Sequence, residues 1–211
     1  MKCLVVGGGA IGTSIAWHLA ERGLGEVVLL EQDRFGAGTT WHSAGNITWR
    51  PLPDQDAPVL YAFEAIDRLE RDGLATGWLK TGRTFFAASE AFRNKLATFD
   101  AAARERGLPA RFLDSKEATA LNPLLDPSKI DAIWLNPLSG RVNPADLTAA
   151  YAAAARRAGA TIREGVEVRS IATQGGRVTG VETNQGFIAG DTVVCAAGLW
   201  SRSLLRSVGV A

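Results

Sequence analysis

The sequence predicts an α/β fold that contains a parallel sheet. Residues 2–6 form a short apolar run closed by three glycines, and apolar residues then recur at helical spacing until Gly23. A second apolar run follows at residues 27–30. This order of strand, turn, helix and strand is a βαβ unit, which we expect to be right-handed and to place its two strands parallel.

The middle of the chain alternates helical and strand patterns after a long loop. Residues 34–58 are rich in Gly, Thr, Pro and Asp and show little periodicity, which indicates a loop of the length that often carries function. The patterns that follow predict a helix at 58–72, a strand at 84–88, a helix at 90–106, a strand at 112–113, a helix capped by Asp114, a strand at 132–135 and a helix to residue 158 that begins with Asn143 as its N-cap.

The last part of the chain changes to short alternating segments. Residues 160–162, 166–171, 177–183 and 186–190 predict a small antiparallel meander, with turns at 175–176 and 184–186. The continuous apolar run at 191–197 predicts a buried parallel strand, and a helix is expected after Gly198.

Composition excludes several classes of function. The formal net charge is +1, and no run of five or six like charges occurs, so neither nucleic acid nor a membrane surface is an expected partner. Cys3 and Cys195 lie in apolar runs, which indicates buried strand thiols rather than a disulfide or a metal site. The first strand leaves no room for a signal peptide, and no apolar run is long enough to span a bilayer, so we expect a cytoplasmic protein.

The first turn carries a dinucleotide fingerprint. Residues 7–12 fit G-x-G-x-x-G between a strand and a helix, where Gly7 allows the tight turn, Gly9 lets the backbone approach a pyrophosphate and Gly12 lets the helix pack on the strand. Glu31 ends the second strand about twenty residues later, where it can accept hydrogen bonds from ribose hydroxyls. Since its charge would repel a 2′-phosphate, this Rossmann-like unit is expected to bind NAD or FAD.

Two further features favour FAD over NAD. Ala16, with Leu19 and Gly23, resembles an extended pattern of FAD-dependent enzymes, although an NAD-binding unit can share it. The segment DTVVCAAGLWS at residues 191–201 resembles the late strand of flavoproteins, where a turn at Gly198 passes near the flavin. Its alternative is an ordinary buried strand ended by a glycine.

These pieces together resemble the D-amino-acid-oxidase-like family of FAD-dependent oxidoreductases, and within it the sarcosine and dimethylglycine dehydrogenase group. The resemblance runs over nearly the whole chain and is carried by GGGAIGTSIAWHLAERG, VVLLEQDRFGAGTTWHSAG, LNPLL, GRVNPADLTAAYAAAARRAGATI and GVETNQGFIAGDTVVCAAGLWS. It implies an FAD-binding domain from about 1–50 and 142–211 and part of an α+β substrate domain at about 51–141. It also implies that the family fold continues past the C-terminus, so that the chain is a truncated, N-terminal part.

The same resemblance assigns roles to individual residues. In the matching group, the histidine of T-W-H carries FAD covalently through the flavin 8α-methyl carbon, which places that role on His42; a neutral imidazole is a competent nucleophile near neutral pH. The alternative for His42 is a polar loop residue. The residues expected to bind the cofactor are Gly7, Gly9, Ala10, Ile11, Gly12, Glu31, Gln32, Gly38, Thr39, Thr40, Trp41, His42, Ser43, Gly45, Val168 and Gly198.

Two of these assignments have close alternatives. Trp41 either packs against the flavin ring or is a buried anchor of its loop. Val168 matches a position whose backbone meets the adenine, or is simply a core residue. His18, the other histidine of the chain, is expected to have a structural or surface role.

The implied activity is oxidation of a secondary or tertiary N-methyl amine such as sarcosine or dimethylglycine. Hydride would pass from the N-methyl carbon to flavin N5, and water or, in a full-length protein, tetrahydrofolate would trap the iminium product. The partner is thus a small-molecule amine; the sequence identifies no catalytic base, no metal site and no oligomeric state. The alternatives are another family member with noncovalent FAD, such as a glycerol-3-phosphate or D-amino-acid oxidising enzyme, and a non-catalytic regulatory relative.

Overall fold

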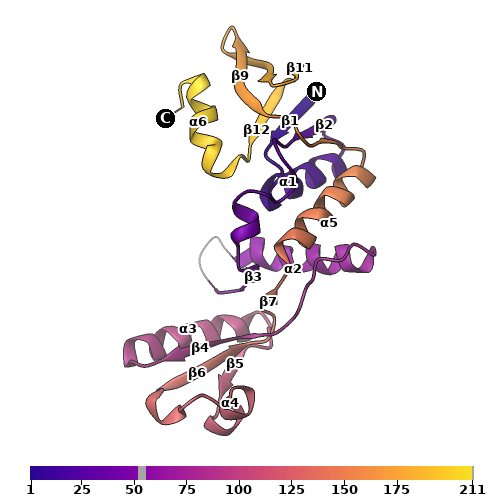
Figure 1. Ribbon diagram of the computed structural model, residues 1–211. Coiled ribbons are helices and arrows are strands. Elements are labelled where there is room, and N and C mark those ends of the chain that lie inside the picture. The colour runs from indigo at the N-terminus through magenta and orange to yellow at the C-terminus, as the bar shows by residue number, and fades with distance from the viewer. Residues whose placement is uncertain (52–55, 211) are drawn as a thin grey trace. The chain divides into compact units, whose positions relative to one another are not determined.

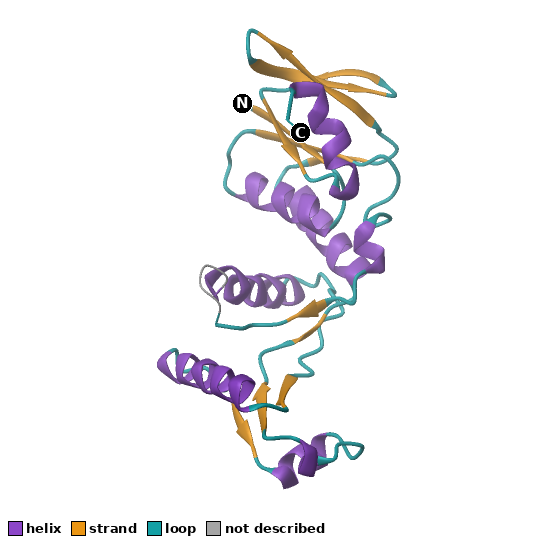
Figure 2. Ribbon diagram, turned by 90° about the vertical axis from the view of Figure 1, so that its left-hand side faces the viewer, coloured by secondary structure: helices purple, strands orange, loops and turns teal. Residues whose placement is uncertain are grey.

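The computed structural model of the chain describes residues 1–51 and 56–210, and it divides into two compact units (Figure 1). Unit 1 consists of Met1–Gly45, Arg68–Gly77 and Asn143–Ala211, and unit 2 of Asn46–Asp67 and Trp78–Val142. Unit 2 is therefore inserted into the sequence of unit 1. The segment Arg68–Gly77 belongs to unit 1, although it falls inside the range that the sequence analysis gave to the substrate domain. Both units combine helices with strands (Figure 2).

A parallel sheet forms the centre of unit 1. Its strands are β1 (Lys2–Val6), β2 (Glu26–Leu30), β8 (Thr161–Arg163) and β12 (Thr192–Cys195), in the order β12-β1-β2-β8. All three pairings are parallel, as the βαβ pattern predicted for β1 and β2. The two central strands are almost entirely apolar because a parallel sheet is covered on both faces.

Two helices lie side by side on one face of this sheet, α1 (Ala10–Glu21) and α5 (Pro144–Arg157) (Figure 1). Helix α5 begins where the sequence predicted. The side chain of Asn143 accepts hydrogen bonds from the backbone N–H groups of Ala145, at 3.0 Å, and Asp146, at 3.4 Å. This N-cap satisfies donors that the first helical turn leaves unpaired.

The other face of the parallel sheet packs against an antiparallel meander of β9 (Val168–Gln174), β10 (Arg177–Thr183) and β11 (Gly186–Ala189). The shared core contains Leu4 and Val28 from the parallel sheet and Ile171 and Val181 from the meander. Three short helical turns complete this layer at the end of the chain: η3 (Gly198–Trp200), α6 (Ser201–Leu205) and η4 (Arg206–Val208).

Unit 2 is built around a second, antiparallel sheet in the order β4-β6-β5, with one face covered by α3. Its described elements are β3 (Asn46–Ile47) paired with β7 (Gly140–Arg141), β4 (Arg83–Ala87), α3 (Glu90–Glu105), β5 (Arg111–Leu113), α4 (Ser115–Leu121), η2 (Pro127–Lys129) and β6 (Ala132–Asn136). Helix α2 (Asp56–Arg71) is divided between the two units. The core of unit 2 is aromatic, and Trp49 and Trp134 are fully buried in it.

The fold class predicted from the sequence is confirmed, but four local expectations were wrong. Residues 160–162 were assigned to the meander, whereas β8 pairs in parallel with β2, because a three-residue segment has too little periodicity to reveal its partner. The strand β12 is parallel as expected, yet Val193, Val194 and Cys195 are only half-buried, since β12 lies at the edge of its sheet. The expected buried thiol is therefore found at Cys3 alone.

The other two differences concern irregular segments. The predicted loop at 34–58 contains the 3₁₀ turn η1 (Thr39–His42) and the strand β3, and α2 begins at Asp56; residues 52–55 lie outside the described part of the chain. The expected C-terminal helix is broken into three turns. None of the helices in the described residues is long and apolar enough to cross a membrane.

Candidate functional site

All of the predicted cofactor-binding residues lie in unit 1. They come from three stretches that the fold brings together: the turn between β1 and α1, the loop that contains η1, and the turn after β12. Glu31 and Val168 lie beside these stretches on two further elements. The prediction of the site itself remains a proposal, developed below.

The turn after β1 combines two tightly packed glycines with the N-terminus of α1. Gly7 has a φ of +110°, and a side chain there would collide with the carbonyl oxygen of Ala196. A side chain at Gly12 would collide with the carbonyl oxygen of Gly7, so α1 can pack this closely only because residue 12 is glycine. Helix α1 starts at Ala10 without a side-chain cap at Gly9 and without an acidic residue in its first turn. Such a helix terminus attracts an anion, and nothing in the first turn repels a pyrophosphate.

Glu31 is held at the end of β2 by the same turn. One carboxylate oxygen accepts a hydrogen bond from the backbone N–H of Gly8 at 2.6 Å, and the other accepts one from Asp33 at 2.9 Å. A carboxylate has about four acceptor positions, so two remain for ribose hydroxyls. Gln32, the next residue, is exposed. The structure therefore fits the ribose-binding role expected for Glu31.

The loop at 36–42 is tied to the glycine turn at both ends. The N–H of Gly36 donates to the Gly8 carbonyl at 3.0 Å, and the N–H of Ala10 donates to the hydroxyl of Thr40 at 3.1 Å. Thr40 thus satisfies one of the donors at the start of α1 from thirty positions away in the sequence. Since Thr40 and His42 belong to the same 3₁₀ turn, η1, this pair of hydrogen bonds also fixes the position of His42 relative to the glycine turn.

The side chains at the end of this loop face solvent. His42 is exposed, and Trp41 has 68% of its surface exposed. The alternative that Trp41 is a buried anchor is therefore wrong, because the backbone hydrogen bonds of the loop replace such an anchor. Ser43 continues the loop and accepts a hydrogen bond from Gly45 at 3.2 Å.

The turn after β12 lies against this loop. Gly198 has a φ of +55° and sits next to the Thr39 hydroxyl, while the Trp200 ring lies against Gly38. Trp200 is half exposed and was not among the predicted binding residues. Its presence within the DTVVCAAGLWS segment was the available signal, since that segment had already been linked to the flavin.

Val168 begins β9 and is half-buried against the core of unit 1. Two residues before it, the N–H of Val166 donates to the carbonyl of Glu31 at 2.8 Å. The structure thus places the chain that leads into Val168 directly beside the expected ribose-binding residue.

His18 has a structural position within α1. Its Nδ1 lies 2.7 Å from the carbonyl oxygen of Ser14, so this nitrogen carries a proton and the ring is held by its own helix.

A glycine turn at a helix N-terminus, with an acidic residue at the end of the next strand, is typical of dinucleotide-binding α/β proteins. More specifically, the chain belongs to the FAD dependent oxidoreductase family, whose model matches residues 2–210. Membership of this family favours FAD in the choice between NAD and FAD that the motif left open.

Individual relatives agree with this assignment. The chain is 35% identical, over all of its length, to 26% of a 4-methylaminobutanoate oxidase (formaldehyde-forming) from Paenarthrobacter nicotinovorans. It is 32% identical over 98% of its length to 23% of the mitochondrial sarcosine dehydrogenase of Mus musculus. The chain therefore spans about a quarter of these relatives, and the expected likeness to the sarcosine and dimethylglycine dehydrogenase group is confirmed.

A solved structure shows the same fold. The crystal structure of glycine oxidase from Geobacillus kaustophilus matches all of this chain with a TM-score of 0.81 and 28% sequence identity. The match covers 59% of the glycine oxidase chain. The architecture described above is thus one that this glycine oxidase also adopts.

Proposed function

We propose that the protein oxidises a secondary or tertiary N-methyl amine, such as sarcosine or dimethylglycine, with FAD bonded to His42. The substrate class is suggested by the relatives, which are named for oxidation of such amines. The observation that best supports FAD bonded to His42 is the hydrogen bond between Ala10 and Thr40. It ties the turn that would hold the FAD pyrophosphate to the turn that presents an exposed His42.

Each part of FAD would meet a different element of unit 1. The pyrophosphate would bind the backbone of Gly7–Gly12 at the start of α1, and the ribose would donate hydrogen bonds to Glu31. The adenine would contact the backbone near Val168. The residues from Gly38 to Gly45, with Gly198, would line the path toward the flavin.

His42 would supply the covalent link. A nitrogen–carbon bond would replace the imidazole N–H bond and one C–H bond of the flavin methyl group. The two hydrogens and their electrons would reduce the flavin ring, and an oxidant such as dioxygen would return it to the oxidised form. When bound, FAD would accept a hydride from the N-methyl carbon of the substrate, as flavins do in amine oxidation. The role of this chain is to fix the cofactor's position, which the anchored loop at 36–42 is built to do.

The wider proposal concerns the whole protein. Tetrahydrofolate or water would take up the one-carbon product, and an electron acceptor, either dioxygen or another electron carrier, would reoxidise the reduced flavin. The amine would be the small-molecule partner. A cytoplasmic location is included in the proposal and fits the two free cysteines, Cys3 and Cys195.

The covalent link is tested by denaturing gel electrophoresis with detection of flavin fluorescence. The wild-type protein and the His18→Ala variant should both show fluorescence at the position of the protein, and His42→Ala should show none. His18 is the matched control because the chain has only two histidines. Fluorescence retained by His42→Ala would exclude His42 as the attachment site.

A further outcome separates the covalent claim from the family assignment. If no variant is fluorescent on the gel, but acid releases free FAD from the native wild-type protein, the covalent link is wrong and the noncovalent alternative holds. Substrate class is tested by flavin reduction with a panel of amines. Sarcosine and dimethylglycine should reduce the flavin faster than glycine or D-alanine, and equal rates would contradict the proposed N-methyl specificity.

A further inference from the structure

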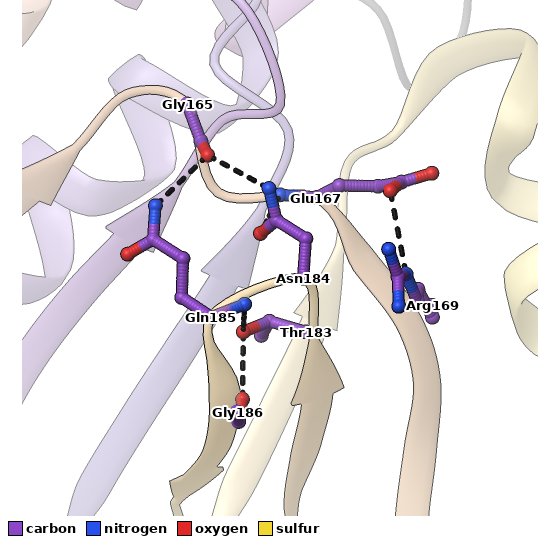
Figure 3. Close-up of polar contacts among 7 residues, drawn as sticks. All are labelled: Gly165, Glu167, Arg169, Thr183, Asn184, Gln185 and Gly186. Atoms are coloured by element: carbon purple, nitrogen blue, oxygen red, sulfur yellow. Dashed lines mark hydrogen bonds and ion pairs between the residues drawn. The ribbon is translucent and has the colours of Figure 1, made fainter.

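Side-chain amides join the turn between β10 and β11 to the segment that leads into β9 (Figure 3). The amide nitrogen of Asn184 donates to the carbonyl of Gly165 at 3.1 Å, and that of Gln185 donates to the same oxygen at 3.0 Å. Asn184 also exchanges two hydrogen bonds with the backbone of Glu167: its Oδ1 accepts from the N–H, and its own N–H donates to the carbonyl, both at 3.0 Å. Asn184 therefore holds the backbone on both sides of residue 166.

The turn that presents these amides is itself ordered by hydrogen bonds. The buried hydroxyl of Thr183 donates to the carbonyl of Gly186 at 2.6 Å and accepts from the N–H of Gln185 at 3.0 Å (Figure 3). The amide oxygen of Gln185 accepts from the Arg163 guanidinium at 2.8 Å. Because the turn is closed by its own bonds, Asn184 and Gln185 act from a fixed position.

The opposite side of the same segment is bonded to the end of β2. The N–H of Glu31 donates to the carbonyl of Arg163 at 2.9 Å, and the N–H of Val166 donates back to the carbonyl of Glu31 at 2.8 Å. The N–H of Gly165 donates to the carbonyl of Asp33 at 3.3 Å. Residues 163–167 are thus held between the proposed ribose-binding residue on one side and the amides of Asn184 and Gln185 on the other.

We propose that Asn184 and Gln185 are positioning residues for the adenosine half of the cofactor. They would not touch the cofactor; they hold the backbone that leads from Gly165 to Val168 at a fixed distance from Glu31. This inference rests on the proposed function, in which ribose binds Glu31 and adenine lies near Val168. It adds that adenosine affinity depends on a turn of the meander that the dinucleotide fingerprint does not include.

A purely structural role makes a different prediction. If the amides only stabilised the fold, their removal would weaken binding of both halves of the cofactor alike. A positioning role acts on the adenosine half alone. Because the backbone from Gly165 to Val168 would shift relative to Glu31, loss of the amides should weaken adenosine binding roughly tenfold, which corresponds to about 1.4 kcal/mol.

The test measures binding of ADP and FMN by titration calorimetry, since these ligands represent the two halves of FAD. The protein carries His42→Ala so that flavin can be removed, and the variant adds Asn184→Ala with Gln185→Ala. We expect the dissociation constant for ADP to rise roughly tenfold while that for FMN stays unchanged. The unfolding temperature should fall in either case, because the N–H of Glu167 loses its acceptor, so the ratio of the two dissociation constants is the deciding result. The matched control is Gln174→Ala, an exposed amide at the far turn of the same meander, which should alter neither ligand.

The outcomes separate the two claims. Unchanged ADP binding in the double variant, or equal weakening of ADP and FMN, would overturn the positioning role. If the parent protein binds neither ligand, the proposed function fails first, and this inference falls with it. Should the double variant not fold, Asn184→Asp replaces it: the carboxylate keeps the acceptor for Glu167 but faces the Gly165 carbonyl without a donor, so ADP binding should still weaken selectively.

Discussion

Two tryptophans beside the candidate site in unit 1 are exposed, whereas two tryptophans in the core of unit 2 are fully buried. Trp41 and Trp200 are 68% and 50% exposed, while Trp49 and Trp134 in unit 2 are fully buried. Large exposed apolar side chains in a monomer often mark a binding surface, and here they lie next to a backbone turn suited to an anion. The same residue type therefore indicates a ligand site in one unit and a core in the other, and only burial tells them apart.

Each unit also has a glycine that allows a close backbone approach. Gly12 of unit 1 allows α1 to approach the glycine turn, and Gly140 of unit 2 makes room for the Leu79 carbonyl and the ring of Trp78. Unit 2 also exposes Leu121 and Leu124 around the end of α4, but no predicted binding residue lies there. The cofactor chemistry proposed for this chain therefore depends on the backbone shape of unit 1. The aromatic packing of unit 2 contributes to stability.

The largest effect on stability is expected in the aromatic core. Trp134 is fully buried, and its indole N–H donates to Asp100 at 3.1 Å. Trp134→Ala should lower the unfolding free energy by about 3–5 kcal/mol, measured by chemical denaturation, because it leaves a large cavity. Trp134→Phe keeps most of the ring and should cost less. A loss below about 1 kcal/mol for the alanine variant would show that this core is not what stabilises unit 2.

A substitution in the glycine turn should lower stability less than Trp134→Ala does, but it should abolish binding. Gly12→Ala places a methyl group against the Gly7 carbonyl, which should cost about 1–3 kcal/mol and abolish ADP binding. Gly23→Ala is the control, because Gly23 has a φ of +64° and open space around it. It should cost about 1 kcal/mol through backbone strain and leave ADP binding intact. If Gly12→Ala still binds ADP, the backbone shape of the glycine turn in unit 1 is not what determines binding.

The anchor of the η1 loop gives a still smaller effect. Thr40→Val has nearly the same shape but leaves the N–H of Ala10 without its acceptor, so stability should fall by about 1 kcal/mol. The yield of covalent flavin on a denaturing gel should fall as well, since His42 loses part of its support. Thr40→Ser keeps the hydroxyl and should retain both properties; if it behaves like valine, the hydroxyl is not the anchor.

The two free thiols, Cys3 and Cys195, are expected to react with alkylating reagents at different rates. Cys3 is buried, and burial raises the pKa of its thiol, so less of the reactive thiolate forms at a given pH. Cys195 is only half-buried. Iodoacetamide should therefore modify Cys195 before Cys3, as followed by mass spectrometry of the native protein. Equal rates would mean that the sheet of unit 1 opens more readily than its packing implies.

Local patterns explain what the sequence could predict. The βαβ unit, the glycine turn and the Asn143 cap depend on neighbouring residues, and each was found where expected. The hydrogen bond from Ala10 to Thr40, the parallel pairing of β8 with β2 and the contact of Trp200 with Gly38 all join distant residues. No periodicity encodes such contacts, because they are set by how the finished sheet brings its strand ends together.

The most direct test of the account is the mass of one tryptic peptide. Trypsin cuts after Arg34 and Arg68 but not at Arg50, which precedes Pro51, so His42 lies in the peptide 35–68 and His18 in the peptide 3–22. The peptide 35–68 from the purified protein should carry the added mass of one FAD less two hydrogens, and fragmentation should place the flavin on His42. An unmodified peptide 35–68 from protein that holds flavin, or a flavin on the peptide 3–22, would contradict attachment at His42.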